Sequence, residues 1–201
     1  MLELYIVRHG QTETNHQNRV NGITNLSLNE SGRTQVKNLK KNFDTTKIDE
    51  IYSSPLKRAF ETAQILNDGS KVIQTDNRIC EINYGSWDGL TVEETKSLHP
   101  DGYDENNLIS EKYIHYVNNG ESFENVFNRV DDFLSFISKK KNEKIMIVCH
   151  AFVARAILKE VLNIPNIINI LESDNAGVTK IMISDSLTPY LMYYNRVSNI
   201  N

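Results

Sequence analysis

The stretch Leu4-Tyr5-Ile6-Val7-Arg8-His9-Gly10 decides how this chain folds. Its first four residues form an uninterrupted apolar run, which is typical of a strand buried on both faces of a sheet. The run ends at an arginine and a histidine, and the glycine that follows allows the backbone to turn. Ligands of open α/β sheets bind outside the carboxyl ends of the strands, so Arg8 and His9 occupy a favourable position for a functional site. Taken alone, His9 is equally compatible with a structural histidine bonded to a nearby carbonyl.

Further apolar runs predict additional strands, which together with the first can form one sheet. The predicted strands are Leu4–Val7, Glu50–Ser53, Val72–Gln74, Lys144–Cys149, Val178–Ile183 and Tyr190–Tyr194. Helical patterns separate the first four of them, and alternation of strand and helix favours a parallel sheet covered on both faces. The sequence therefore predicts an α/β fold, a three-layer α/β/α sandwich with a mainly parallel central sheet of about six strands.

Capping residues and apolar periodicity locate the helices of this sandwich. Asn29 is expected to cap the first helix, and Ser54 the second, with Pro55 at its first position. A third helix begins near Ser122 and ends in the lysines at 139–141, where positive charge suits a helix C-terminus. A fourth helix follows the next predicted strand.

The segment 90–120 interrupts the alternation. A capping box of Thr91 and Glu94 predicts a short helix that stops near Pro100 and gives way to a polar stretch. Long insertions in compact domains are commonly functional loops or lids, although a floppy excursion is the alternative. We therefore predict a single domain over residues 1–201, in which this segment forms a lid that determines specificity.

Composition excludes several functional classes. With 39% apolar residues, 24% charged residues and a net charge of −4, the chain reads as an ordinary globular protein without the basic field of a nucleic-acid-binding protein. No apolar run is long enough to span a membrane, and the first strand leaves no room for a signal peptide, so a cytoplasmic location is expected. Cys80 and Cys149 lack metal-ligand spacing and are expected to be reduced thiols. No metal or cofactor is predicted.

Three further ionisable residues follow predicted strands. Arg58 lies in the first turn of a helix, where its guanidinium and the helix N-terminus can bind one anion. His150 ends a second apolar strand, and parallel strands deliver such residues to one edge of the sheet. Glu81 follows the third strand and is a candidate proton donor. Each residue also has an ordinary alternative: Arg58 as an exposed arginine, His150 as a structural histidine and Glu81 as a loop carboxylate. Because all three follow strands, as Arg8 does, a shared anion site is the favoured interpretation.

Five motifs follow one another along the chain: Arg8-His9-Gly10-Gln11-Thr12, Ser54-Pro55-x-x-Arg58-Ala59-x-x-Thr62-Ala63, Glu81-x-x-x-Gly85-x-Trp87-x-Gly89-Leu90-Thr91, Gly120-Glu121-Ser122 and Val148-Cys149-His150. With these motifs in this order, the chain resembles the histidine phosphatase (phosphoglycerate mutase-like) superfamily. The resemblance extends from residue 4 to Asn195, which is nearly the whole length. The resemblance implies an α/β/α fold and a phosphohistidine intermediate.

The resemblance also implies roles for individual residues. His9 is the nucleophile, Glu81 the proton donor, and Arg8, Arg58 and His150 complete the catalytic phosphate pocket. The residues implied to contact phosphate or substrate are Arg8, Asn15, Asn21, Gly22, Arg58, Glu81, His150 and Ala151. Gly22 would permit close approach of the backbone to the substrate.

Two positions depart from the family pattern. Ala151-Phe152 follows the second histidine where the family usually has glycine, which predicts a less open backbone or a pocket wall formed by Phe152. Ile82-Asn83 stands where the family's mutases have Arg-His, which favours the phosphatase branch.

These features predict a metal-independent phosphatase that hydrolyses small phosphomonoesters through a phosphohistidine on His9. Its expected partner is a small phosphorylated metabolite, and neither nucleic acid nor a membrane is expected. A phosphoglycerate-type mutase and a non-catalytic phosphate-binding or interaction module are the alternatives. The sequence leaves the oligomeric state and the identity of the substrate open.

Overall fold

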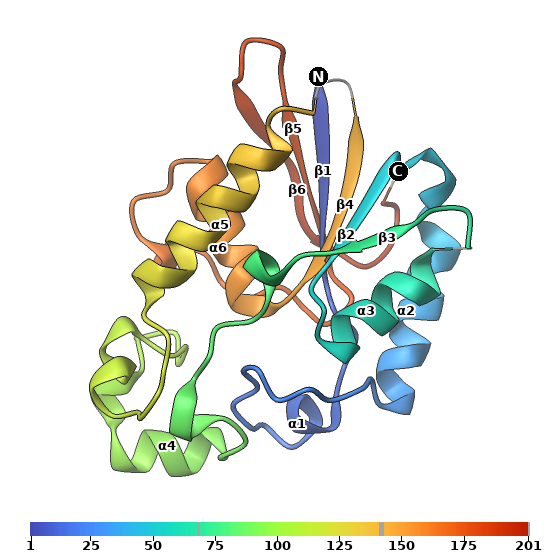
Figure 1. The fold of residues 1–201 in the computed structure, drawn as a ribbon. Coiled ribbons are helices and arrows are strands. Elements are labelled where there is room, and N and C mark those ends of the chain that lie inside the picture. The colour runs from blue at the N-terminus through green and yellow to red at the C-terminus, as the bar shows by residue number, and fades with distance from the viewer. Residues whose placement is uncertain (68, 141–142, 201) are drawn as a thin grey trace.

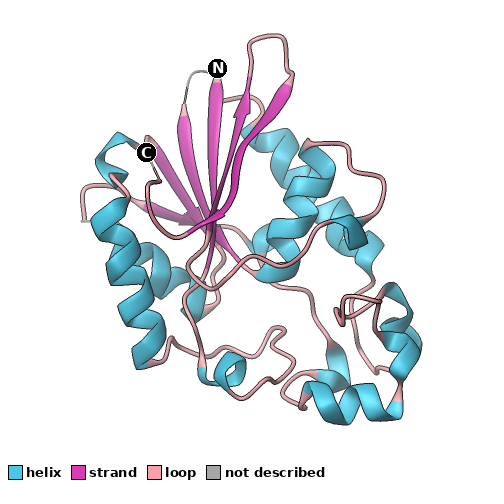
Figure 2. Cartoon of the chain, turned by 180° about the vertical axis from the view of Figure 1, so that it is seen from behind, coloured by secondary structure: helices cyan, strands magenta, loops and turns pink. Residues whose placement is uncertain are grey.

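The computed structural model describes residues 1–67, 69–140 and 143–200, which form one six-stranded sheet with helices on both faces (Figures 1 and 2). The strands are β1 (Leu2–Arg8), β2 (Glu50–Ser53), β3 (Ile73–Thr75), β4 (Lys144–Cys149), β5 (Val178–Ile183) and β6 (Pro189–Arg196). The α-helices are α1 (Glu13–His16), α2 (Glu30–Asn42), α3 (Lys57–Leu66), α4 (Val92–Leu98), α5 (Phe123–Ile137) and α6 (Ala151–Val161). The predicted α/β sandwich is confirmed.

The strand order β3-β2-β4-β1-β5-β6 places β1 and β4 side by side near the centre of the sheet. These two strands are parallel, with Arg8 paired in register with Cys149, so the residues that follow them lie next to each other. The strands β2 and β3 continue the parallel part, with β2 paired to β4 and β3 paired to β2. On the other side of β1, β5 runs antiparallel to β1, and β6 runs antiparallel to β5. The antiparallel direction brings the beginning of β5 beside the end of β1.

Both faces of β1 are buried, which explains its continuous apolar sequence. Leu4 and Ile6 belong to the core beneath α5 and α6, and Tyr5 and Val7 belong to the core beneath α2 and α3. Figure 1 shows these two helix pairs on opposite sides of the sheet. Alternate side chains of a strand point to opposite faces, so each strand residue contributes to one of the two cores.

The helix starts largely follow the predicted caps. Asn29 and Ser122 each accept a hydrogen bond from the backbone of the first turn, as expected. The prediction for α3 is wrong, because this helix begins at Lys57 after an N-cap at Leu56. The Ser54 hydroxyl lies 2.8 Å from Nε2 of His150 and accepts a 3.3 Å hydrogen bond from the N–H of Leu56, which precedes the helix. The predicted lysine-rich end of α5 falls partly outside the described residues, and α5 itself ends at Ile137.

The segment 90–120 packs against an aromatic cluster around Trp87. The indole ring stacks on His99 and Tyr103, with ring centroids 6.0 and 5.8 Å away. An isolated bridge between Tyr103 and Ile109 closes the polar stretch between them. The segment is therefore a folded element on the body of the domain, and the predicted capping box at the start of α4 is present.

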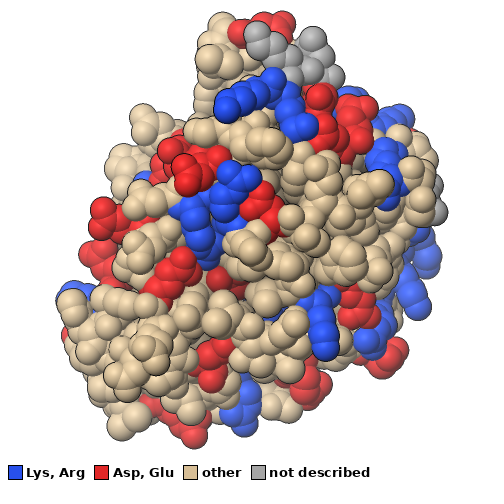
Figure 3. All heavy atoms as spheres, viewed as in Figure 1, with Lys and Arg blue, Asp and Glu red and all other residues tan. Residues whose placement is uncertain are grey.

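Charges of both signs are interspersed over the face of the molecule that Figure 3 shows. This face carries no broad surface of one sign. Of the described residues, no helix combines the length and apolar character needed to cross a bilayer.

Gly32 in the first turn of α2 fixes the backbone next to His9. A Cβ atom at this position would lie 2.1 Å from the carbonyl oxygen of Gln11, a contact that requires movement of the backbone. We expect Gly32→Ala to lower the free energy of unfolding by about 1–3 kcal/mol, as overpacking does. Urea unfolding checks this, with the exposed Ser31→Ala as the control, and equal stability of the two variants would contradict it.

Candidate active site

A cavity of about 300 Å³ opens at the carboxyl end of β1. Of the predicted site residues, it is lined by Arg8, His9, Asn15, Asn21, Glu81 and Ala151. The segment 90–120 supplies a further part of the wall, namely Val92, Tyr103, Asn107, Leu108 and Ile109. The structure thus brings side chains from five separate parts of the sequence to one enclosed space.

The hydrogen bonds of the His9 ring determine which of its two nitrogens is unprotonated. Its Nδ1 lies 2.7 Å from the carbonyl oxygen of Gly10, which can only accept, so Nδ1 carries the proton. Nε2 therefore keeps its lone pair and accepts a 3.2 Å hydrogen bond from Nε of Arg58. Burial, followed by the charges of Arg58 and Arg8, lowers the pKa of His9 well below its usual value. The imidazole is neutral near pH 7, which is the state that a nucleophile requires.

Arg58 lies fully buried behind His9 in the first turn of α3. Its Nη1 and Nη2 donate to the carbonyl oxygens of Thr24 and Gly22, at 2.8 and 2.5 Å. Burial lowers the pKa of this guanidinium to about 10, so it remains charged at neutral pH. The three hydrogen bonds fix the guanidinium plane against the histidine ring.

His150 lies beside His9 because β4 lies beside β1. The two ring centroids are 5.2 Å apart. Burial and then Arg58 lower the pKa of His150 well below its usual value, so the ligand-free imidazole is neutral. Within the described residues, Nδ1 of His150 and Nε of Arg8 are buried without a hydrogen-bond partner. Unpartnered buried donors and acceptors are costly, and they are what a site retains for its ligand.

Glu81 contributes the carboxyl group of the cavity. It is almost fully buried, and its two oxygens accept hydrogen bonds from the backbone nitrogens of Ile82 and Phe152, at 3.0 and 3.3 Å. Burial raises the pKa of Glu81, and the two N–H donors and Arg58 oppose the rise only in part. A raised pKa suits a group that must hold a proton and then release it.

The neighbouring predicted residues take different positions. Asn15 and Asn21 both contact Thr12, which caps α1 in a capping box with Asn15. Gly22 is not part of the cavity lining, and its N–H donates to Asp88 while its carbonyl holds Arg58. The expectation that Phe152 walls the pocket is wrong.

Phe152 is a core residue. Its ring lies 4.4 Å from the ring of Phe123 between centroids, and only 1% of its surface is exposed. The helix α6 begins directly after His150, which turns the first side chain, Ala151, toward the cavity and the next one into the core. Ala151 therefore lies at the site without closing it.

The amino-acid sequence matches the profile of the histidine phosphatase superfamily (branch 1) over residues 4–195. The chain belongs to this superfamily. It is 33% identical over 166 residues to the protein named phosphoserine phosphatase 1 of Hydrogenobacter thermophilus, covering 82% of this chain and 78% of that one. It is also 33% identical to phosphoglycerate mutase-like protein 4 of Arabidopsis thaliana, over 77% of this chain and 69% of that one. The solved structure of Bacillus stearothermophilus YhfR matches over 100% of both chains, with a TM-score of 0.85 and 27% identity.

The resemblance inferred from the motifs is thereby confirmed, and the chain is a phosphoric monoester hydrolase of the histidine phosphatase superfamily. Among the residues that the structure describes, no group of three or more His, Cys, Asp and Glu side chains is arranged to hold a metal ion. Burial raises the pKa of both Cys80 and Cys149, which lowers their reactivity as thiolates.

Several cavity-lining residues are not among those that the sequence predicted, namely Asn18, Arg19, Val20, Tyr84, Glu172 and Asn175. Of these, Glu172 and Asn175 lie in the loop before β5. Asn175 donates to the carbonyl oxygen of His9 at 3.1 Å, and Glu172 lies 3.4 Å from Arg8. No periodicity or motif marks this loop. Only the antiparallel pairing of β5 with β1 brings it to the active site.

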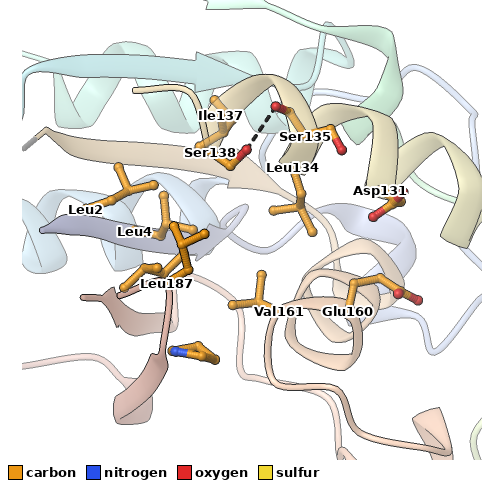
Figure 4. Close-up of a pocket in the computed structure, with 12 residues that line it drawn as sticks. Leu2, Leu4, Asp131, Leu134, Ser135, Ile137, Ser138, Glu160, Val161 and Leu187 are labelled. Carbon is orange, nitrogen blue, oxygen red and sulfur yellow. Dashed lines mark hydrogen bonds between the residues drawn. The ribbon is translucent and has the colours of Figure 1, made fainter. Parts of the chain in front are cut away.

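A second cavity, of about 270 Å³, lies at the opposite end of β1 (Figure 4). Its wall consists mainly of aliphatic side chains, including Leu2, Leu4, Leu134 and Leu187. None of the described residues that line it is an arginine, lysine or histidine that could bind a phosphate. The cavity at His9, which is lined by Arg8, is therefore the better candidate of these two for a phosphate site.

The buried pair His9 and His150 is expected to make the enzyme acid-sensitive. Both pKa values are lowered in the folded chain, whereas the unfolded chain binds protons near the ordinary value of 6.5. The contribution of the two neutral histidines to the free energy of unfolding is therefore fully present above pH 6.5, and it decreases as the pH falls below that value. We expect a loss of up to about 1.4 kcal/mol per histidine between about pH 7.5 and 5.5.

Urea unfolding of the wild type and of His150→Gln at both pH values checks this expectation. The variant has one buried imidazole fewer and should lose less stability on acidification. The same loss in both proteins would contradict the assignment of the effect to this pair.

Proposed function

We propose that this enzyme is a metal-independent phosphatase that hydrolyses small phosphomonoesters through a phosphohistidine on His9. The observation that carries the proposal is the unprotonated Nε2 of His9, held by Arg58 at the cavity that also contains the buried carboxyl group of Glu81. The cavity of about 300 Å³ suits a small metabolite. Phosphoserine, which appears in the names of relatives, is a first candidate substrate.

Phosphate binding would use the groups that the protein leaves unpartnered. Phosphoryl transfer proceeds through a loose transition state with negative charge on the equatorial oxygens, so catalysis consists mainly of positioning and neutralisation. Arg8 and Arg58 supply fixed positive charge. The dianionic phosphate supplies the counter-charge that favours protonation of His150, which burial keeps neutral in its absence.

The first chemical step forms a bond between Nε2 of His9 and phosphorus and breaks the bond from phosphorus to the ester oxygen. The leaving alkoxide takes the proton of Glu81. In the second step the Glu81 carboxylate accepts a proton from water, and the resulting hydroxide attacks phosphorus. The N–P bond breaks, and inorganic phosphate leaves.

Hydrolysis is favoured over phosphoryl transfer to a second substrate by the residues after Glu81. Ile82 is fully buried in the core, and the side chain of Asn83 donates to the carbonyl oxygen of Asn119 and accepts from the N–H of Gly85. Neither provides a cation that would hold a second anionic substrate in the cavity.

The test is phosphate release from a panel of small phosphomonoesters, with a metal chelator present throughout. Release that is unaffected by chelation supports the proposal. Release that disappears with the chelator and returns with added Mg²⁺ overturns its metal-independent part. Phosphoryl exchange that needs a bisphosphate primer identifies a mutase, and phosphate binding without turnover identifies a binding module.

A further inference from the structure

Glu172 is a carboxylate in a cavity built for phosphate. Its Oε2 lies 3.4 Å from Nη1 of Arg8, and the side chain, one-third exposed, lines the same cavity as His9 and Glu81. Its charge reaches the catalytic groups, since it is among the causes that raise the pKa of Glu81. Within the described residues this carboxylate accepts no hydrogen bond, and its ion pair with Arg8 involves only Oε2, so it retains capacity to accept from a ligand in the cavity.

Holding Arg8 in place does not account for this residue. Nη1 of Arg8 already donates to the carbonyl oxygen of Ser173, a neutral acceptor that fixes the guanidinium without opposing a phosphate. A carboxylate at the same guanidinium repels the phosphate and reduces the attraction that Arg8 exerts on it. For a substrate that is only an anion, Glu172 is unfavourable. A substrate that carries its own positive charge beside the phosphate removes the conflict.

We propose that Glu172 binds an ammonium group of the substrate and makes the enzyme selective for aminoalkyl phosphates. The inference rests on the proposed phosphatase activity and adds the substrate class to it. Arg8 borders both the phosphate site and Glu172, so the ammonium lies close to the ester. A primary ammonium two carbons from the ester oxygen meets this requirement. The same carboxylate discriminates against phosphomonoesters that carry only negative charge.

A matched pair of substrates tests the proposal. O-phosphoethanolamine and n-propyl phosphate have the same size, and a methyl group in the second replaces the ammonium of the first. We expect the wild type to have the higher kcat/KM for phosphoethanolamine. Glu172→Gln should lower the ratio of the two kcat/KM values on the order of 10- to 100-fold, because a charge-assisted hydrogen bond is lost for one substrate only. Glu105→Gln, an exposed glutamate outside the cavity lining, is the control and should retain the wild-type ratio.

The outcomes separate this inference from the proposal on which it rests. If Glu172→Gln lowers kcat/KM equally for both substrates, the residue only positions Arg8 and the inference is overturned. A wild-type enzyme that hydrolyses both substrates without preferring the amine also overturns it. If the wild type releases phosphate from neither substrate nor any other phosphomonoester, the phosphatase proposal fails, and the inference fails with it.

Discussion

His9→Ala is expected to abolish phosphate release, with a loss in kcat on the order of 10⁵-fold or more. No other nitrogen takes over the attack. The second imidazole, His150, is fully buried and uses Nε2 in a contact with Ser54, and its remaining nitrogen, Nδ1, is the one that we assign to phosphate binding. The measurement is the rate of phosphate release from the best substrate of the panel, compared with His115→Ala, whose histidine is exposed and does not line the cavity.

A trapping experiment separates the loss of a nucleophile from a loss of folding. Wild type mixed rapidly with labelled substrate should retain protein-bound phosphate that is stable to base and labile to acid, as phosphohistidine is. His9→Ala should remain folded and retain none. Residual turnover of the variant within about tenfold of the wild type would exclude a covalent role for His9.

Glu81→Gln is expected to slow the hydrolysis of alkyl phosphates by about 10²- to 10⁴-fold, the usual contribution of a general acid. The glutamine amide has nearly the shape of the carboxyl group, but it cannot give a proton to the leaving alkoxide. One of the two backbone N–H donors, from Ile82 or Phe152, keeps its acceptor. The fold should therefore persist, with Glu124→Gln on the exposed face of α5 as the control.

The dependence on the leaving group decides the role of Glu81. Nitrophenol departs as a stable anion, so the substitution Glu81→Gln should reduce the hydrolysis rate of nitrophenyl phosphate far less than that of alkyl phosphates. The raised pKa of Glu81 adds a second signature. With alkyl substrates, kcat of the wild type should fall as the pH rises through this pKa, because the donor loses its proton. Equal losses for good and poor leaving groups would assign Glu81 a structural role instead.

The sequence was most informative where burial is local and continuous. The bounds of β2, β4 and β5 agree residue for residue with the predicted strands, since an apolar run between polar ends requires no knowledge of its neighbours. The juxtaposition of His9 and His150 followed from the same reasoning. Two parallel strands that end in histidines place both residues at one edge of the sheet. Because β1 and β4 are also adjacent, the two histidines lie side by side.

The sequence was less informative where one side chain has competing partners. Ser54 has the chemistry of a helix cap, yet its hydroxyl contacts His150, a residue 96 positions away, and α3 begins later. The phenyl ring of Phe152 was expected at the pocket, but the start of α6 turns it into the core against Phe123. Neither outcome can be read from spacing, because both depend on contacts between distant segments.

By itself, the sequence determined the α/β class and most strand and helix positions, because burial patterns are properties of short segments. Its motifs also predicted the candidate site residues Arg8, His9, Arg58, Glu81 and His150. The tertiary structure alone decided the direction of β5 and the packing of the segment 90–120 around Trp87. It also decided the tautomer of His9, the raised pKa of Glu81 and the presence of Glu172 in the cavity. These features arise from hydrogen bonds, desolvation and strand pairing between residues far apart in the chain, and such interactions exist only once the fold is formed.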